Sequence, residues 1–227
     1  MALRHYGWPV SPYSAKTRAY LRFKQVPFDD VEPTARQLYG RIQKAVGRMV
    51  MPTVERDDGT WLQDTSEIID TLESELGGTT ITPPGPCQRL ANLLLELHGD
   101  EWLPLVAMHS RWNVAGNPDF ARDEFARCGV PWLPTVLGRR LTAPIANKMA
   151  GYLPLLGIRK DTAPGVERFA HRLIAQLDVH LAEHAFILGS RPCLADFALH
   201  GPLWAHTWRD PASRSWFDGA ANVTAWF

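Results

Sequence analysis

The chain has 227 residues, and its 24 lysine and arginine residues balance 24 aspartate and glutamate residues, so the formal net charge is zero. Such a balance argues against nucleic acid or a membrane surface as the main partner, and no window approaches the roughly 18 apolar residues of a membrane span. The first residues lack the apolar run of a signal peptide. Three distant cysteines, odd in number, indicate reduced thiols: Cys87, Cys128 and Cys193. We therefore expect a globular cytoplasmic protein.

The first third of the chain alternates between strand-like and helix-like runs. The predicted strands are residues 3–7, 28–32, 53–56 and 61–63, and the predicted helices are residues 12–25, 34–46 and 66–76. The run Asp57-Asp58-Gly59-Thr60 separates the last two strands and is typical of a hairpin, because glycine accepts a positive φ. The order βαβαββα combines a parallel βαβ unit with an antiparallel hairpin and a closing helix.

The rest of the chain is predicted to be helical. Residues 77–86 contain three glycines and three prolines, which indicates a linker. Apolar stripes then predict helices, clearest over residues 166–181 and present again over residues 194–206. Residues 113–165 carry six prolines and little periodicity, which predicts short helices and loops. The predicted domains are residues 1–76, a linker over 77–86, and an all-helical domain over 87–227.

The most informative motif is Ser11-Pro12-Tyr13-Ser14, which joins the first predicted strand to the first predicted helix. A helix that begins here directs its free N–H groups at one point, and such a point attracts anions, including a thiolate. The motif also has the outline of a Cys-Pro-Tyr-Cys redox motif in which both sulfurs are replaced by oxygen. Helix capping alone explains a serine followed by proline equally well.

Four local motifs together resemble the cytosolic glutathione transferases, and the resemblance spans nearly the whole chain. They are Ser11-Pro12-Tyr13-Ser14, Met51-Pro52-Thr53-Val54, Asp64-Thr65-Ser66-Glu67-Ile68-Ile69, and Leu188-Gly189 followed by Cys193-Leu194-Ala195-Asp196-Phe197. The first is similar to the active-site helix start of the serine-type classes, among them bacterial, tau and zeta enzymes. The resemblance implies a two-domain α+β fold, with a thioredoxin-like βαβαββα domain followed by an all-α helical bundle.

Two features depart from the family pattern. The helical-domain motif of the family usually starts with a serine or threonine N-cap, and here Cys193 stands in that place. A thiol is a weak acceptor, so the change costs on the order of 1 kcal/mol, although Asp196 can still reach back to the backbone N–H of the cap. Family members also commonly continue through a further helix beyond the position of Phe227.

The resemblance implies that Ser11 is the catalytic residue. Its hydroxyl would donate a hydrogen bond to the sulfur of bound glutathione and stabilise the thiolate, without any need for serine to ionise. Ser14, one turn further along the helix, is the alternative donor.

The same resemblance assigns the rest of the glutathione site. Met51 and Pro52 would form a cis peptide that presents the backbone of Met51 to the cysteinyl unit of glutathione. Asp64 would meet the ammonium of the γ-glutamyl group and Thr65 its carboxylate, although helix capping also explains both residues. The glycyl carboxylate requires a cation, which is either Lys44 or Arg48.

The electrophile is expected against the helical domain, between apolar walls. The candidate residues are Trp8, Tyr13, Trp102, His109 and Trp112, with core packing as the alternative for each aromatic side chain. His180 and His184 lie four residues apart on one helical face, but no third ligand accompanies them, so we expect no metal.

Several functions remain compatible with this sequence. The leading one is a glutathione transferase that activates the thiolate for attack on a small apolar electrophile, acting as a homodimer by resemblance. An isomerase or dehalogenase that uses the same thiolate, or a non-catalytic binding protein with this fold, is the alternative. A thiol oxidoreductase requires a protein thiolate, which Ser11 and Ser14 remove from the motif.

Overall fold

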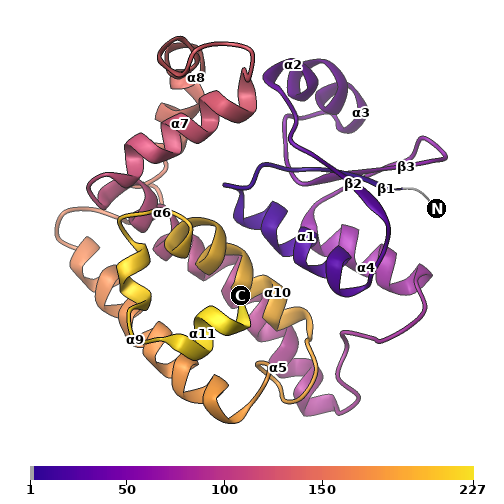
Figure 1. Cartoon of the computed structure of the whole chain (residues 1–227). Coiled ribbons are helices and arrows are strands. Elements are labelled where there is room, and N and C mark those ends of the chain that lie inside the picture. The colour runs from indigo at the N-terminus through magenta and orange to yellow at the C-terminus, as the bar shows by residue number, and fades with distance from the viewer. Residues whose placement is uncertain (1–2) are drawn as a thin grey trace.

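The computed structural model describes residues 3–227 and contains a small α/β domain packed on a larger helical domain (Figure 1). The sheet has the strand order β2-β1-β3-β4, in which β1 pairs with β2 in parallel and with β3 antiparallel. Its strands are β1 (Leu3–Tyr6), β2 (Phe28–Val31), β3 (Thr53–Arg56) and β4 (Trp61–Gln63). The predicted parallel unit and antiparallel hairpin are therefore both present.

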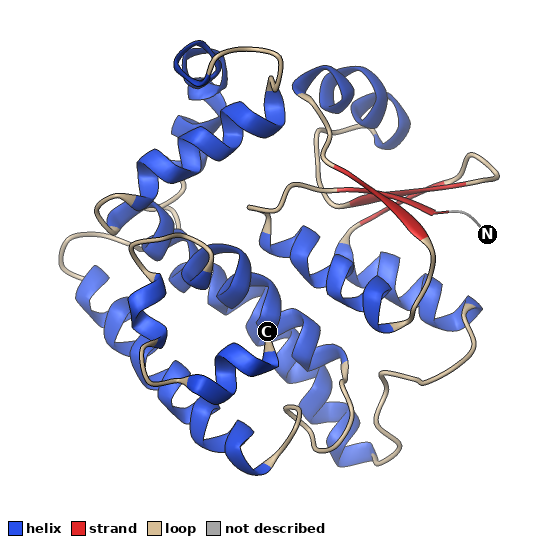
Figure 2. Cartoon of the chain, in the orientation of Figure 1, coloured by secondary structure: helices blue, strands red, loops and turns tan. Residues whose placement is uncertain are grey.

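Helices cover both faces of this sheet, which is drawn in red in Figure 2. On the face towards the helical domain lie α1 (Pro12–Phe23) and α4 (Thr65–Glu75), and the other face is covered by the short helices α2 (Ala35–Gln37) and α3 (Gln43–Val46). A π-helical turn, η1 (Leu38–Ile42), joins α2 to α3, so the predicted helix over residues 34–46 is a composite. Apolar side chains of β1, α1 and α4, such as Leu3, Leu21 and Ile69, form the core between these layers.

The second domain is built from helices alone, as predicted. Its elements are α5 (Pro86–Leu97), η2 (His98–Trp102), α6 (Leu103–Asn113), α7 (Asn117–Gly129), α8 (Thr135–Ala150), α9 (Ala163–Glu183), α10 (Leu194–Pro202), η3 (Leu203–Trp208), η4 (Arg214–Phe217) and α11 (Ala221–Trp226). The stripe predicted over residues 166–181 lies within α9 and packs on α6, α10 and α11.

The prediction of short helices and loops over residues 113–165 is right for the loops, which include residues 130–134 and 151–162, but it underestimates the helices. This segment contains α7 and α8, which have 13 and 16 residues. Pro118 lies in the first turn of α7, where a missing N–H costs little. Pro144 lies inside α8 and is accommodated in the exposed part of that helix. These two prolines therefore do not interrupt the helices of this segment.

The two domains meet along α1 and α10, which pack closely. A Cβ atom on Gly201 would lie 2.5 Å from the carbonyl oxygen of Pro12, so only glycine permits this approach. The buried Lys16 ammonium donates to Glu96 and Asp100 of the helical domain at 2.9 and 2.6 Å. The start of α1 is thus fixed by contacts with both domains.

The start of α10 shows how the cysteine cap is supported. The Asp196 carboxylate accepts hydrogen bonds from the backbone N–H and the thiol of Cys193, and also from the Ile187 N–H and the Trp226 indole. The backbone contact predicted for Asp196 is confirmed. Burial, followed by the nearby Asp196 carboxylate, raises the pKa of the Cys193 thiol to about 12, so this cysteine stays protonated.

All three cysteines are free. Within residues 3–227, no helix combines the length and the apolar character that crossing a bilayer requires.

Candidate active site

The hydroxyl of Ser11 lies at the N-terminus of α1. Ser11 is the N-cap, and its Oγ accepts a hydrogen bond from the Ser14 N–H at 3.2 Å. This bond uses a lone pair of the oxygen, so the O–H of Ser11 remains able to donate to a ligand. Capping the helix and binding a ligand anion are therefore compatible roles for the same hydroxyl.

Ser14 occupies a different environment. Its side chain is fully buried, and within residues 3–227 its Oγ has no hydrogen-bond partner. The hydroxyl packs under the backbone of Gly7, where a Cβ atom would lie only 2.5 Å from it. Ser14 lines neither of the two cavities at this site. The geometry therefore separates the two serines of the motif.

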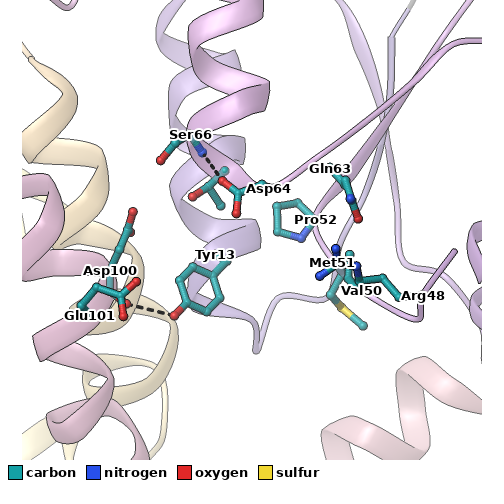
Figure 3. Close-up of a pocket in the computed structure, with 11 residues that line it drawn as sticks. Tyr13, Arg48, Val50, Met51, Pro52, Gln63, Asp64, Ser66, Asp100 and Glu101 are labelled. Atoms are coloured by element: carbon teal, nitrogen blue, oxygen red, sulfur yellow. Dashed lines mark hydrogen bonds between the residues drawn. The ribbon is translucent and has the colours of Figure 1, made fainter. Parts of the chain in front are cut away.

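A polar cavity of about 330 Å³ lies beside the N-termini of α1 and α4 (Figure 3). Its lining residues come from both domains: Tyr13, Arg48, Val50, Met51, Pro52, Gln63, Asp64, Thr65, Ser66, Asp100 and Glu101. In Figure 3, Asp100 and Glu101 lie on one side of the cavity, and Arg48 lies on the opposite side. The cavity thus offers carboxylates at one end and a guanidinium at the other.

The start of α4 forms one wall of this cavity. Asp64 has a left-handed backbone, with φ of 72°, and its carboxylate accepts a hydrogen bond from the Ser66 N–H at 3.0 Å. This arrangement leaves Asp64 exposed and Thr65 buried at the helix N-terminus. The Ser66 hydroxyl donates to Glu96 at 2.9 Å, which ties α4 to the helical domain. Hydrogen bonds within the α/β domain and to the helical domain therefore both fix the start of α4.

The opposite wall comes from the segment before β3. The Met51–Pro52 peptide bond is cis, as the resemblance implied. Both residues line the polar cavity, and the Met51 sulfur accepts a hydrogen bond from the Trp8 N–H at 3.4 Å. This contact connects the cis peptide to the loop that leads into Ser11.

A second, larger cavity of about 560 Å³ adjoins the first and is mainly apolar. Tyr13, Val50 and Met51 line both cavities, and Ser11 lines the apolar one. Aromatic and methionine side chains form most of its wall: Trp8, Trp112, Phe125, Tyr152, Met49, Met108 and Met149. Ser11 therefore faces the apolar cavity, and Tyr13, two residues further on, lines both cavities.

Tyr13 stands at this junction without the properties of a base. Its hydroxyl donates to the Asp100 carbonyl oxygen at 3.0 Å. Burial raises the pKa of Tyr13 to about 12, with further contributions from the negative charges of Asp100, Glu101 and Asp64. The phenol is therefore protonated at neutral pH and serves as a wall and as a contact between domains.

Three of the predicted site residues lie elsewhere. Lys44 is exposed on α3 and lines neither cavity, so of the two predicted cations only Arg48 is in place. His109 points away from the apolar cavity towards Glu167 and Trp216, because the turn of α6 directs Met108 and Trp112 into the cavity instead. Trp102 is an exposed residue of η2.

Sequence reasoning also missed part of the site. Asp100 and Glu101 belong to η2 in the helical domain, and no local motif connects them with the α/β domain. Gln63 and Ser66 flank Asp64 and Thr65 directly, so their proximity to the recognised motif was an available signal. Within residues 3–227, no group of three or more histidine, cysteine or carboxylate side chains could hold a metal ion.

The chain is similar to known proteins in sequence and in fold. Residues 6–80 match the family model "Glutathione S-transferase, N-terminal domain". A search of curated proteins found no match. Among solved structures, a glutathione S-transferase from Methylobacterium radiotolerans, in complex with glutathione sulfonate, is similar with a TM-score of 0.58 and 19% identity, over 100% of this chain and 88% of that one.

Two further structures are similar over nearly the full length. The β-etherase LigF from Sphingobium sp. strain SYK-6 has a TM-score of 0.66 and 18% identity, over 100% of this chain and 93% of that one. Glutathione transferase F7 from Populus trichocarpa has a TM-score of 0.60 and 15% identity, over 99% and 91% of the two chains. Residues 6–80 thus belong to the glutathione S-transferase N-terminal domain family, and the whole chain has the glutathione S-transferase fold.

Proposed function

We propose that this protein is a glutathione transferase in which Ser11 stabilises the glutathione thiolate. The observation that carries the proposal is the position of Ser11, a helix N-cap whose O–H can donate to a ligand and which lines the apolar cavity that adjoins the polar one. The family match over residues 6–80 supports glutathione as the ligand of the polar cavity.

The polar cavity fits an extended tripeptide with a charged group at each end. The carboxylates of Asp64, Asp100 and Glu101 suit the ammonium of the γ-glutamyl group. The N-terminus of α4, with Thr65, suits the adjacent carboxylate. At the other end Arg48 suits the glycyl carboxylate. In this orientation the cysteinyl unit passes Met51 and places its sulfur towards Ser11.

The free energies involved are sufficient for thiolate formation without a base. A free thiol has a pKa near 8.5, and lowering it by two units requires about 2.7 kcal/mol. A hydrogen bond to an ionised group contributes roughly 1.5–3 kcal/mol. The N-terminus of α1, a helix of 12 residues, adds about 0.3–1 kcal/mol. Ser11 and its helix together therefore reach the required value.

The chemical step follows from this arrangement. The thiol proton leaves to solvent, and the thiolate sulfur attacks an electrophilic carbon held in the apolar cavity. A C–S bond forms while the leaving group departs with the bonding electron pair. Holding both reactants at the junction of the cavities supplies proximity and orientation, which are large terms in such reactions. A glutathione-dependent isomerase or dehalogenase would use the same thiolate with a different second substrate.

The second substrate is a small apolar electrophile. The walls of the apolar cavity are aromatic side chains and thioethers, which favour aromatic and aliphatic groups over charged ones. The only charged side chains among its lining residues within residues 3–227 are Arg111 and Lys148, and Arg111 is paired with Asp210.

The assembly is a homodimer formed through α5. Four leucines on one face of this helix are each more than half exposed: Leu90, Leu93, Leu94 and Leu97. A contiguous apolar patch of this kind marks an association surface. A solution mass that corresponds to one chain would contradict the dimer.

A structure with bound glutathione tests the proposal directly. The sulfur is expected within hydrogen-bond distance of the Ser11 Oγ, with the γ-glutamyl group at the start of α4. A sulfur closer to Ser14, or a tripeptide bound outside the polar cavity, would overturn the assignment.

A further inference from the structure

Several segments of this neutral chain contain no acidic residue, among them residues 1–28, 33–54 and 125–160. Residues 33–54 hold four basic residues and residues 125–160 hold six, and neither segment holds an aspartate or glutamate. We call these two segments the basic rim. The rim therefore carries ten of the 24 lysine and arginine residues and none of the 24 acidic ones. The net charge of zero conceals this separation.

The two parts of the basic rim lie at the same end of the molecule. The first part contains α2 and α3, the second contains α8, and these helices lie together at the top of Figure 1. Both parts also line the apolar cavity, with Leu38 and Met49 from the first and Met149 and Tyr152 from the second. The basic rim thus forms part of the wall of the cavity in which the electrophile is expected.

Many cations of the rim have no protein partner. Arg41, Arg127, Arg139 and Arg159 form ion pairs with acids that lie just outside the two segments. The remaining six are exposed and, within residues 3–227, form no ion pair: Arg36, Lys44, Arg48, Arg140, Lys148 and Lys160. Their charges are therefore available to an external anion.

Helix α8 adds an exposed apolar face to this charge. One face of α8 packs on α7 so closely that a Cβ atom on Gly138 would lie 2.9 Å from the Cβ of Ala126. The rest of the helix surface exposes Val136, Leu137 and Leu141 beside Arg140. Further exposed apolar side chains flank the helix at Trp132, Tyr152 and Leu155. Six exposed apolar side chains thus lie on α8 or close to its two ends.

We propose that the basic rim docks on an anionic lipid bilayer, with the exposed face of α8 inserted at the interface. Exposed basic and apolar side chains on one helix, with an exposed tryptophan just before its start, are features that favour binding at a membrane surface. Anionic lipids supply the charge that the unpaired cations lack. Docking in this orientation turns the apolar cavity towards the bilayer.

This orientation has a consequence for the substrate. An apolar electrophile dissolved in the bilayer would enter the cavity between the two parts of the rim without crossing water. This consequence rests on the proposed transferase function, whereas docking itself does not. A small anionic ligand would account for the cations at the cavity, but it would leave Val136 and Leu141 uncovered, because these two residues lie outside the cavity.

Flotation with lipid vesicles tests the proposal on the full chain. The purified protein is mixed with vesicles of phosphatidylcholine, either pure or containing phosphatidylglycerol, at low and high salt. Binding is expected to the anionic vesicles and is expected to weaken with salt, because exposed charges are screened. Absence of binding to the anionic vesicles, or equal binding to both kinds, would overturn the proposal.

Two pairs of matched variants locate the surface. Arg36→Glu combined with Arg140→Glu should weaken binding at least about 25-fold, since each cation near an anionic surface contributes roughly fivefold. Arg168→Glu combined with Arg172→Glu makes the same charge change on exposed residues of α9 and should leave binding unchanged. Leu141→Ser should weaken binding, whereas Val179→Ser, at another exposed position on α9, should not.

The controls separate docking from folding and from the transferase reaction. Circular dichroism and thermal unfolding establish that each variant is folded, and none of the substituted side chains lines either cavity. Equal weakening by the variants of the basic rim and by those of α9 would overturn the proposal. So would self-association that Leu141→Ser abolishes in the absence of vesicles, because the exposed apolar side chains of α8 would then contact a second copy. Vesicle binding by a protein that lacks transferase activity would leave docking intact and refute only the proposed function.

Discussion

The guanidinium of Arg111, in the helical domain, donates a 2.6 Å hydrogen bond to the carbonyl oxygen of Val10, the residue before Ser11. The same side chain is 2% exposed and forms two hydrogen bonds of 2.7 Å with the Asp210 carboxylate. The loop that presents Ser11 is therefore held by the helical domain as well as by its own strand and helix. A correct Ser11 geometry depends on this buried ion pair.

Replacing Asp210 by asparagine should destabilise the protein by about 3–5 kcal/mol, because the charge of Arg111 would remain buried without its partner. Urea unfolding measures this loss. Asp119→Asn is the matched control, since that carboxylate pairs with Arg139 at the surface and contributes at most about 1 kcal/mol. Equal effects of the two substitutions would contradict a structural role for the Arg111–Asp210 pair.

Arg48 and Lys44 should differ in their effect on glutathione binding. Arg48→Gln should raise the KM for glutathione at least about tenfold, since a hydrogen bond between charged groups contributes roughly 1.5–3 kcal/mol. The kcat should change little, because the glycyl carboxylate is remote from the sulfur. Lys44→Gln removes a cation that lines neither cavity and should have little effect on KM. If Lys44→Gln raised the KM for glutathione more than Arg48→Gln does, Lys44 and not Arg48 would bind the glycyl carboxylate.

Ser14→Ala should keep both the activity and the stability of the protein. The hydroxyl that it removes is buried and makes no hydrogen bond within residues 3–227, so its loss removes a desolvated polar group and no partner. Conjugation of a generic aryl halide and urea unfolding provide the two measurements. A loss of activity above about tenfold, with stability unchanged, would move the thiolate donor from Ser11 to Ser14.

The stability of the protein should decrease as the pH falls below about 6.5. His206 is buried, and this burial, followed by the charge of Arg111, holds the pKa of this histidine well below its usual value. The unfolded chain therefore binds a proton that the folded chain does not, and stability present above pH 6.5 falls by about 1.4 kcal/mol per pH unit for this residue.

The variant His206→Gln isolates this contribution. An amide can donate to the Ala107 carbonyl and accept from Arg111, as the imidazole does, but it does not titrate. Urea unfolding between pH 7 and pH 5 should then show a slope that is shallower by about 1.4 kcal/mol per pH unit. An unchanged slope would show that His206 takes up a proton in the folded protein.

Much of the fold could be predicted from local signals. The strands Thr53–Arg56 and Trp61–Gln63 have the predicted bounds, because the turn that contains Gly59 separates them sharply. The lengths of helices α7 and α8 were underestimated, because their apolar periodicity is weak and their prolines lie where a helix tolerates them. A regular spacing of apolar residues arises where one helix face is buried, and most residues of α8 are exposed or only partly buried.

The candidate site likewise contains residues that local motifs predict and residues that only tertiary packing brings into place. The motifs that begin at Ser11, Met51 and Asp64 each contribute residues to the two adjoining cavities, since each lies at the end of an element of the same domain. Asp100 and Glu101 enter the site through packing between domains, which no local pattern records. The direction of His109 depends on the rotation of α6 about its axis, which tertiary contacts determine.

The pKa of the thiol of bound glutathione tests the central claim most directly. It is measured from the ultraviolet absorbance of the thiolate as a function of pH, in the wild-type protein and in Ser11→Ala. We predict a pKa below about 7 in the wild type and a return to within about one unit of 8.5, the value of a free thiol, in the variant. Glutathione that binds both proteins with the same lowered pKa would contradict the role of Ser11.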